Sequence, residues 1–220
     1  MGFVNMFPTT APGYGPGPPG YPAECNPGGK TGNTQNFTCY TAYLELFVRL
    51  VKPQVLCFDY YTGFSVRAPL NASSGTIYHK NLAIYRNASL KHNIPFWNYC
   101  ECMLAVHFHL GTNWRVPPTV NTVVFGGHRD PSEGELRWAM FTSLAYGSKG
   151  VLYFYYWWPG KGAGLDLGNG IITAKRIASN VSAPLIYVES EHYQQARRIN
   201  SVLRIYGQVL LKATSTAVFT

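Results

Sequence analysis

The segment from His128 to Pro159 narrows the choice of fold sharply, because a helix start, a helix, a helix stop and an apolar strand follow one another in it. We expect Asp130 to cap the helix and Pro131 to occupy its first position. Glu133 falls three residues after that cap, which is the spacing of a capping box. The segment therefore predicts a helix that begins at about residue 131.

The same segment predicts that this helix leads directly into a strand. One apolar face is formed by residues at helical spacing, namely Leu136, Met140, Leu144 and Gly147. Gly147 and Gly150 permit the left-handed backbone that ends a helix. The apolar and aromatic run at 151–157 then has the length of a strand buried on both faces. A helix followed at once by such a strand is typical of a parallel α/β sheet.

Several blocks of sequence in this segment occur in an order that matches a known family. They are Arg129 to Pro131, Glu135 to Trp138, Ser143 to Gly147, Lys149 with Gly150, and Tyr156 with Trp157. Shorter matches are Phe3 to Pro8, Val51 to Pro53, Phe58 to Tyr61, Ile94 to Asn98 and Gly207 to Val218. Together they resemble the (β/α)8 barrel of bacterial glycoside hydrolases of the β-galactosidase type, with the long segment similar to its last helix and strand. The resemblance covers most of the chain and implies the C-terminal half of a TIM-type barrel.

Alternating strands and helices are expected along the rest of the chain. The predicted strands are 3–7, 54–60, 94–101 and 151–157, and the further helices are 40–51, 77–92 and 191–206. The helix at 40–51 is expected to carry Tyr43, Leu46, Phe47 and Leu50 on one face. A Pro/Gly-rich loop spans 8–38, since proline and glycine disfavour helices and central strands. We therefore expect a partial barrel over 1–207, followed at 208–220 by the start of a further segment or a C-terminal strand.

A half-barrel leaves the edges of its sheet open. A complete barrel takes about 250 residues and eight strand–helix units, whereas four units are predicted in these 220 residues. Open edges favour association with other strands. We therefore expect the missing N-terminal half-barrel, or another chain, to cover them. A compact open sheet of four or five strands is the alternative if the chain is whole.

Active sites of parallel barrels lie at the carboxyl ends of the strands. Two carboxylates, Asp59 and Glu101, stand at predicted strand ends, and hydrolysis of a glycoside requires a pair of carboxyl groups. Both are candidate catalytic residues. The candidate substrate-binding residues at or near strand ends are Asn5, Tyr60, Tyr61, Asn98, His128, Arg129, Tyr156, Trp157 and Trp158.

The resemblance implies more specific roles for some of these residues. It places Glu101 on the strand that carries the nucleophile, whereas the acid/base residue comes from a strand that this sequence lacks. The sequence around Glu101, Tyr99 to Cys102, has no match in the family. Structural alternatives stay open: Asp59 could hold the loop after its strand, Glu101 could be a solvated loop residue, and Trp157 could pack in the core.

Composition and charge disfavour several classes of function. The net charge of +8 comes from scattered lysines and arginines, whereas nucleic-acid binding favours a stripe of cations. Arg197, Arg198 and Arg204 share one predicted helix, where a solvated face explains them better. No apolar run has the length of a membrane span. The cysteines and histidines lack the spacing of a metal site, so we expect no metal and no cofactor.

Four N-x-S/T sequons are typical of a secreted glycoprotein and lie at Asn36, Asn71, Asn87 and Asn180. We therefore expect an extracellular or secretory-pathway location. Cys25 and Cys39 could form a disulfide there. The remaining cysteines, Cys57, Cys100 and Cys102, are expected to be buried thiols.

The expected function follows from these features together. The chain is 15% aromatic and 13% charged, a composition that suits a protein whose flat rings stack on sugars and equally one with a large aromatic core. We expect a glycoside hydrolase-like barrel portion that acts on β-linked carbohydrate through a carboxylate pair. The alternative is a non-catalytic glycan-binding or structural extracellular glycoprotein.

Overall fold

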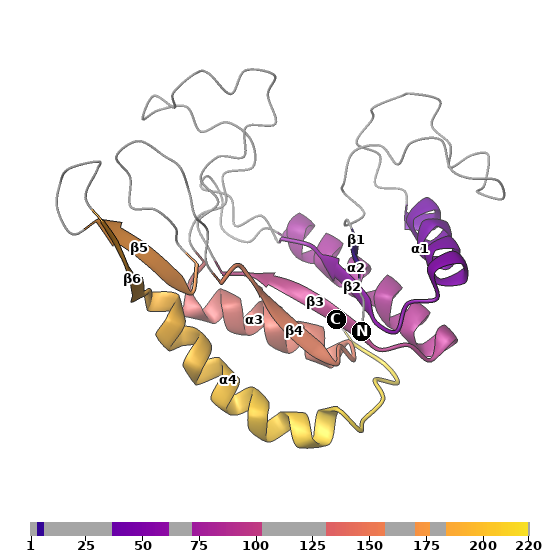
Figure 1. Ribbon diagram of the computed structural model, residues 1–220. Helices are drawn as coiled ribbons and strands as arrows, with labels where there is room; N and C mark the ends of the chain where they lie inside the picture. The colour runs from indigo at the N-terminus through magenta and orange to yellow at the C-terminus, as the bar shows by residue number, and fades with distance from the viewer. Residues whose placement is uncertain are drawn as a thin grey trace, which may run out of the picture.

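A computed structural model describes residues 4–6, 37–61, 72–102, 131–156, 170–176 and 184–219. Within them, four strands form a parallel sheet in the order β1-β2-β3-β4. The strands are β1 (Asn5–Met6), β2 (Leu56–Asp59), β3 (Phe96–Glu101) and β4 (Gly150–Phe154). The predicted parallel α/β architecture is therefore confirmed (Figure 1).

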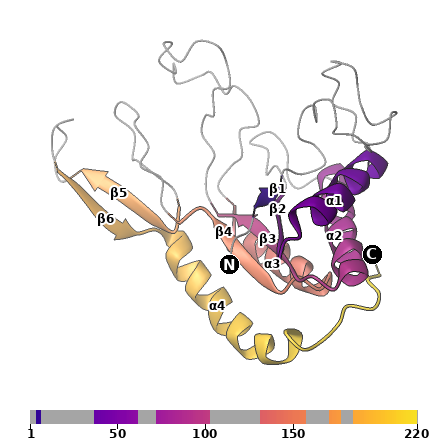
Figure 2. The same ribbon diagram turned by 45° about the vertical axis from the view of Figure 1, so that its right-hand side comes forward.

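Helices alternate with these strands in the described residues, as predicted. They are α1 (Phe37–Val51), α2 (Ala72–His92), α3 (Glu133–Ala145) and α4 (Glu191–Leu210). Figure 2 shows α2, α3 and α4 in an arc along one side of the sheet. A two-stranded antiparallel sheet of β5 (Ile172–Arg176) and β6 (Leu185–Glu189) precedes α4 and was not predicted.

The parallel register divides the strand residues between two faces, because successive side chains of a strand point in opposite directions. The helix-covered face carries Met6, Phe58, Phe96, Asn98 and Cys100. The other face carries Asn5, Cys57, Asp59, Trp97, Tyr99, Glu101, Leu152 and Phe154. We call this second face the helix-free face, since the described helices pack on the opposite side.

Aromatic residues build much of the core between the sheet and the helices. Tyr40, Tyr78 and Tyr85 are among the largest fully buried side chains. The Tyr40 and Tyr85 hydroxyls lie 2.8 Å apart in a hydrogen bond, and the Tyr85 ring stacks on Phe58 with 3.9 Å between centroids. Tyrosine can be buried here because its hydroxyl finds a partner. A large part of the aromatic content therefore serves packing.

The start of α3 differs from the prediction. Ser132 is the N-cap, so the expectation for Asp130 is wrong, and Glu133 is the first helical residue. The Ser132 side chain accepts from the backbone N–H of Glu135, while the Glu135 carboxylate accepts from the Ser132 N–H at 2.9 Å. This reciprocal pair is a capping box displaced by two residues from the predicted one. The spacing alone fits both residues, because Asp130 and Ser132 each have a glutamate three residues later.

The predicted helix stop is confirmed. Gly147 adopts a φ of +91°, the left-handed conformation that favours glycine at the end of a helix. Gly150 is required for another reason, since a Cβ there would lie 2.7 Å from the Trp97 ring. Gly147 thus turns the chain out of α3, and Gly150 lets β4 pass close to the Trp97 side chain of β3.

Three expectations about burial and length are wrong. β4 is half-buried along its whole length rather than buried on both faces, because it is the last strand of the parallel sheet. On α1 the buried residues are Cys39, Tyr40, Leu44 and Val48. Of the predicted face, Tyr43 and Phe47 are partly buried against the core, whereas Leu50 is 64% exposed. The final helix continues to Leu210, and the described residues 211–219 contain no strand.

The cysteines largely behave as predicted. Cys57, Cys100 and Cys102 are buried thiols that form no disulfide. Cys39 is disulfide-bonded, and its predicted partner Cys25 lies outside the described residues. Among the described helices, none is long and apolar enough to span a bilayer.

Candidate functional site

Asp59 and Glu101 end two neighbouring parallel strands, β2 and β3. In the register of these strands Asp59 lies opposite Tyr99. Glu101 is two residues farther along β3, which places both carboxylates on the helix-free face with an offset of about 7 Å along the strand direction. The two candidate catalytic residues therefore converge on one end of one face of the sheet.

Tyr61 connects this pair to the next strand. Its ring stacks on Phe154 of β4 with 4.9 Å between centroids. Glu101 is the residue of β3 that pairs with Phe154, so the contact crosses the sheet at the level of that carboxylate. Burial raises the pKa of the Tyr61 phenol, and the negative charges of Asp59 and then Glu101 raise it further. The phenol therefore stays protonated and can donate a hydrogen bond.

The carboxyl group of Asp59 sits in a strongly desolvated environment. Burial raises its pKa above the ordinary value, while hydrogen bonds with the Tyr61 and Asn5 side chains act in the opposite direction. Its Oδ1 atom is buried and has no hydrogen-bond partner among the described residues. A carboxyl group with a raised pKa is suited to donate a proton near neutral pH.

Glu101 is more enclosed still, with only 4% of its surface exposed. Its position at the end of β3 rules out the alternative of a solvated loop residue. Buried carboxylates in proteins are normally held by specific partners, because removing a charge from water is costly. Both carboxyl groups are therefore desolvated, which makes the pair a candidate functional site.

Two predicted ligand-binding residues lie elsewhere. Asn98 is fully buried on the helix-covered face, where its Nδ2 donates to the Tyr78 hydroxyl and to Ser143 Oγ, both at 2.9 Å. Tyr60 is also buried toward the helices, with its ring 6.1 Å from that of Tyr78. Period-two alternation explains both positions, since each residue is one step away from a residue of the helix-free face.

Tyr156 also lies apart from the carboxylates. It is exposed and borders a hollow of about 830 Å³ between β4 and α4. This hollow is separate from the end of β2 and β3 that carries Asp59 and Glu101. The predicted site residues His128, Arg129, Trp157 and Trp158 lie outside the described residues.

Sequence reasoning assigned no ligand role to three aromatic residues on this face, and it favoured a core position for one of them, Trp97. Trp97, Tyr99 and Phe154 share the helix-free face with Asp59 and Glu101. The rings of Tyr99 and Phe154 meet edge to face at 6.4 Å. The alternation of Trp97, Tyr99 and Glu101 along one strand was the signal that could have identified them.

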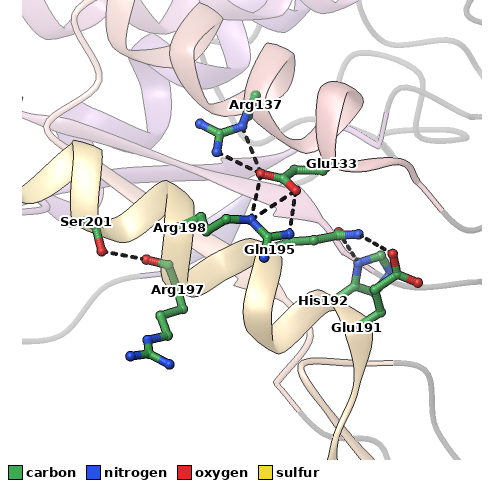
Figure 3. A network of polar contacts seen from close by, with 8 residues as sticks. All are labelled: Glu133, Arg137, Glu191, His192, Gln195, Arg197, Arg198 and Ser201. Atoms are coloured by element: carbon green, nitrogen blue, oxygen red, sulfur yellow. Dashed lines mark hydrogen bonds and ion pairs between the residues drawn. The ribbon is translucent and has the colours of Figure 1, made fainter.

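Glu133 has a structural role, as expected, but it forms ion pairs with arginines instead of completing a capping box. Its carboxylate accepts from Arg137 at 2.7 Å on the same helix and from Arg198 at 2.6 Å on α4 (Figure 3). These hydrogen bonds lower the pKa of Glu133 to about 2. The same view shows His192 hydrogen-bonded to Gln195, which in turn contacts Glu191. This polar cluster holds α4 beside α3.

The chemistry available to the described residues is that of carboxylates and phenols. No group of three or more His, Cys, Asp or Glu side chains that could hold a metal ion occurs in the described ranges. Comparison with known proteins identifies no matching family model, no matching curated protein and no matching solved structure.

Proposed function

We propose that the chain is part of a glycoside hydrolase-like barrel that acts on β-linked carbohydrate, with its site on the helix-free face. The observation that carries this proposal is the position of Asp59 and Glu101 at the carboxyl ends of adjacent parallel strands. Parallel α/β barrels place their active sites at that end of the strands. Two carboxyl groups on one face are also what cleavage of a glycosidic bond requires.

The proposed roles follow from the two environments. Asp59 serves as a proton donor, because burial raises the pKa of its carboxyl group. Glu101 serves as the nucleophile or stabilises positive charge on the sugar ring, as the family resemblance implies. Tyr61 orients the pair, since its phenol stays protonated beside both carboxylates. Trp97, Tyr99 and Phe154 offer flat apolar surface on the same face.

Further strands from another polypeptide segment complete the barrel in this proposal. β1 and β4 each have one edge with no partner strand in the described part of the chain. Unpaired edges of this kind favour strand addition. In the resembled enzymes the acid/base residue lies on an earlier strand, whereas this proposal gives that role to Asp59 within the described sheet.

A secreted location is part of the same proposal. Asn87 is the sequon residue within the described ranges, and it is exposed on α2. A glycosidase that removes N-linked glycans should therefore increase the gel mobility of the protein from a secreting eukaryotic host. Equal gel mobility of the treated and untreated protein would argue against glycosylation.

Two measurements on the purified chain test the proposal. The first is release of nitrophenol from a panel of aryl β-glycosides, and the second is calorimetric titration with β-linked oligosaccharides. Glu101→Gln and Asp59→Asn should each lower hydrolysis by about a hundredfold or more. Glu45→Gln is the matched control, because Glu45 is ion-paired with Lys91 on the helical side. Hydrolysis that survives both site variants would contradict the assignment.

One observation favours a non-catalytic, glycan-binding or structural glycoprotein as the second candidate. The contact between Tyr61 and Phe154 lies at the level of Glu101, which is only 4% exposed. A nucleophile so enclosed has restricted access to a sugar. This candidate predicts that oligosaccharides bind without turnover, and that Asp59→Asn weakens binding. Absence of both binding and turnover would exclude the two candidates together.

A further inference from the structure

The outer flank of α4 differs in chemistry from the flank that packs on α3. On the α3 side Arg198 is ion-paired with Glu133 at 2.6 Å. On the other side Tyr193, Arg197, Asn200 and Arg204 recur at i, i+4, i+7 and i+11, so they form one stripe along the helix. We call these four residues the α4 stripe.

The α4 stripe borders the hollow between α4 and β4. Its wall on the sheet side includes Tyr153, whose hydroxyl donates to Asn200 Oδ1 at 2.8 Å, and Ile171. Ile205 lies at its rim and is 69% exposed. A groove that combines apolar walls with a rim of polar and charged groups resembles the interface to which an amphipathic helix binds.

The charge of the stripe indicates the chemistry of what it binds. Neither Arg197 nor Arg204 has an ion-pair partner among the described residues, and no carboxylate lines the hollow. The two arginines are seven residues apart, which corresponds to about 10 Å along the helix. A partner helix with carboxylates two turns apart on one edge would match both.

A second copy of this chain fits the stripe poorly. The helix next to the opposite edge of the sheet is α1, and its only acidic residue, Glu45, is already paired with Lys91 and His92. Each copy also carries a net charge of +8, so two copies repel. Both features favour a different polypeptide as the occupant.

We propose that the α4 stripe is a docking surface for an acidic amphipathic helix of another polypeptide segment, with its carboxylates on Arg197 and Arg204 and its apolar face over Tyr193 and Ile205. This proposal deepens the proposed completion of the barrel by naming the surface and the chemistry of the partner. It does not depend on the carboxylate pair of the candidate sugar site, because the hollow lies on the other side of β4.

The test uses a fluorescein-labelled synthetic helix of about 20 residues, with leucines on one face and glutamates two turns apart along its edge. Fluorescence anisotropy measures its binding to the full chain. The double variant Arg197→Glu with Arg204→Glu should weaken binding by about tenfold or more. The matched control, Arg49→Glu with Lys212→Glu, changes the net charge equally at exposed positions outside the hollow and should bind normally.

A charge swap makes the test specific. The same peptide with lysines in place of its glutamates should bind the Arg197→Glu, Arg204→Glu protein and not the unmodified protein. Equal loss in the control variant, or no binding of the acidic peptide, would overturn the proposal. Sedimentation of the unmodified protein as a dimer, together with sedimentation of the double variant as a monomer, would also overturn the proposal, because a second copy would then occupy the α4 stripe. Hydrolysis by the same variants should stay unchanged, because Arg197 and Arg204 lie outside the candidate sugar site. Loss of peptide binding with unchanged hydrolysis therefore separates the two proposals.

Discussion

The two faces of the parallel sheet use the same strands for different purposes. On the helix-covered face Asn98 donates to Tyr78 and Ser143, and the Tyr40 and Tyr85 hydroxyls pair with each other. On the helix-free face burial raises the pKa of Asp59, and its Oδ1 lacks a hydrogen-bond partner in the described residues. Asn98 is tied to the helices through its Nδ2, although its Oδ1, like that of Asp59, is buried without a hydrogen-bond partner in the described residues. The difference is that Asp59 is ionisable, and its charged form is costly to bury. Such costly groups are typical of functional sites.

The largest effect on stability is expected from the core beneath the helix-covered face. Leu44→Ala on α1 should lower the free energy of unfolding by about 2–5 kcal/mol, because the side chain is completely buried and its loss leaves a cavity. Leu50→Ala on the same helix removes an exposed side chain and should cost roughly 0.5 kcal/mol or less. Urea unfolding of both variants checks this. Equal losses would mean that α1 is rotated relative to the sheet.

A smaller loss is expected when the polar network of the same face is broken. Asn98→Ala removes the donor to Tyr78 and Ser143 and should cost about 1–3 kcal/mol. The affinity of the folded protein for oligosaccharide should stay unchanged, since Asn98 points away from the helix-free face. A variant that keeps its stability but loses binding would show that the two faces are wrongly assigned.

On the helix-free face, replacing a polar residue should raise the free energy of unfolding instead of lowering it. The pKa of the Asp59 carboxyl group is raised in the folded state, so the folded protein holds the carboxyl proton more tightly than the unfolded chain does. The free energy of unfolding therefore falls as pH rises from the unfolded pKa to the folded pKa. The interval begins near the ordinary value of 3.8. Asp59→Asn should therefore stabilise the protein at neutral pH, and the gain should vanish below that value.

Urea unfolding across this pH range measures the effect. Glu189→Gln is a suitable control, because it removes the same formal charge from an exposed side chain. A constant difference between Asp59→Asn and the unmodified protein at all pH values would show that the carboxyl group of Asp59 is not desolvated.

The smallest effect is expected at the exposed ion pairs that hold α4 beside α3. Hydrogen bonds from Arg198 and Arg137 lower the pKa of Glu133 to about 2, so their contribution is present above the ordinary value and disappears as pH falls toward 2. Glu133→Gln should lower Tm by roughly 2 °C at neutral pH, as calorimetry can measure. High salt should reduce this difference; a larger decrease in high salt would contradict it.

Sequence patterns predicted the parallel sheet because apolar strand segments alternate with amphipathic helices. They located Asp59 and Glu101 at strand ends for the same reason. They failed where one pattern had two solutions, as at the capping box, where Ser132 rather than Asp130 pairs with the later glutamate. They also did not separate Asn98 from Glu101, although period-two alternation places residues three apart on opposite faces of a strand. Which of the two faces the helices cover depends on the tertiary fold.

The antiparallel strands β5 and β6 were missed for a different reason. β5 reads Ile-Thr-Ala-Lys-Arg with a basic end, and β6 is a run of four apolar residues before Glu189, so neither is long enough to show a clear period. The contact of Tyr61 with Phe154 was equally invisible, because it joins β2 to β4 across a strand that lies between them. Long-range contacts of this kind depend on tertiary packing rather than on local sequence.

A crystal structure of the chain with a bound β-linked oligosaccharide is the most direct test of the proposed sugar site. Our account predicts density for a sugar ring within hydrogen-bonding distance of Asp59, Tyr61 and Glu101. Density confined to the hollow beside α4, or side chains of Asp59 and Glu101 directed toward opposite faces of the sheet, would contradict it.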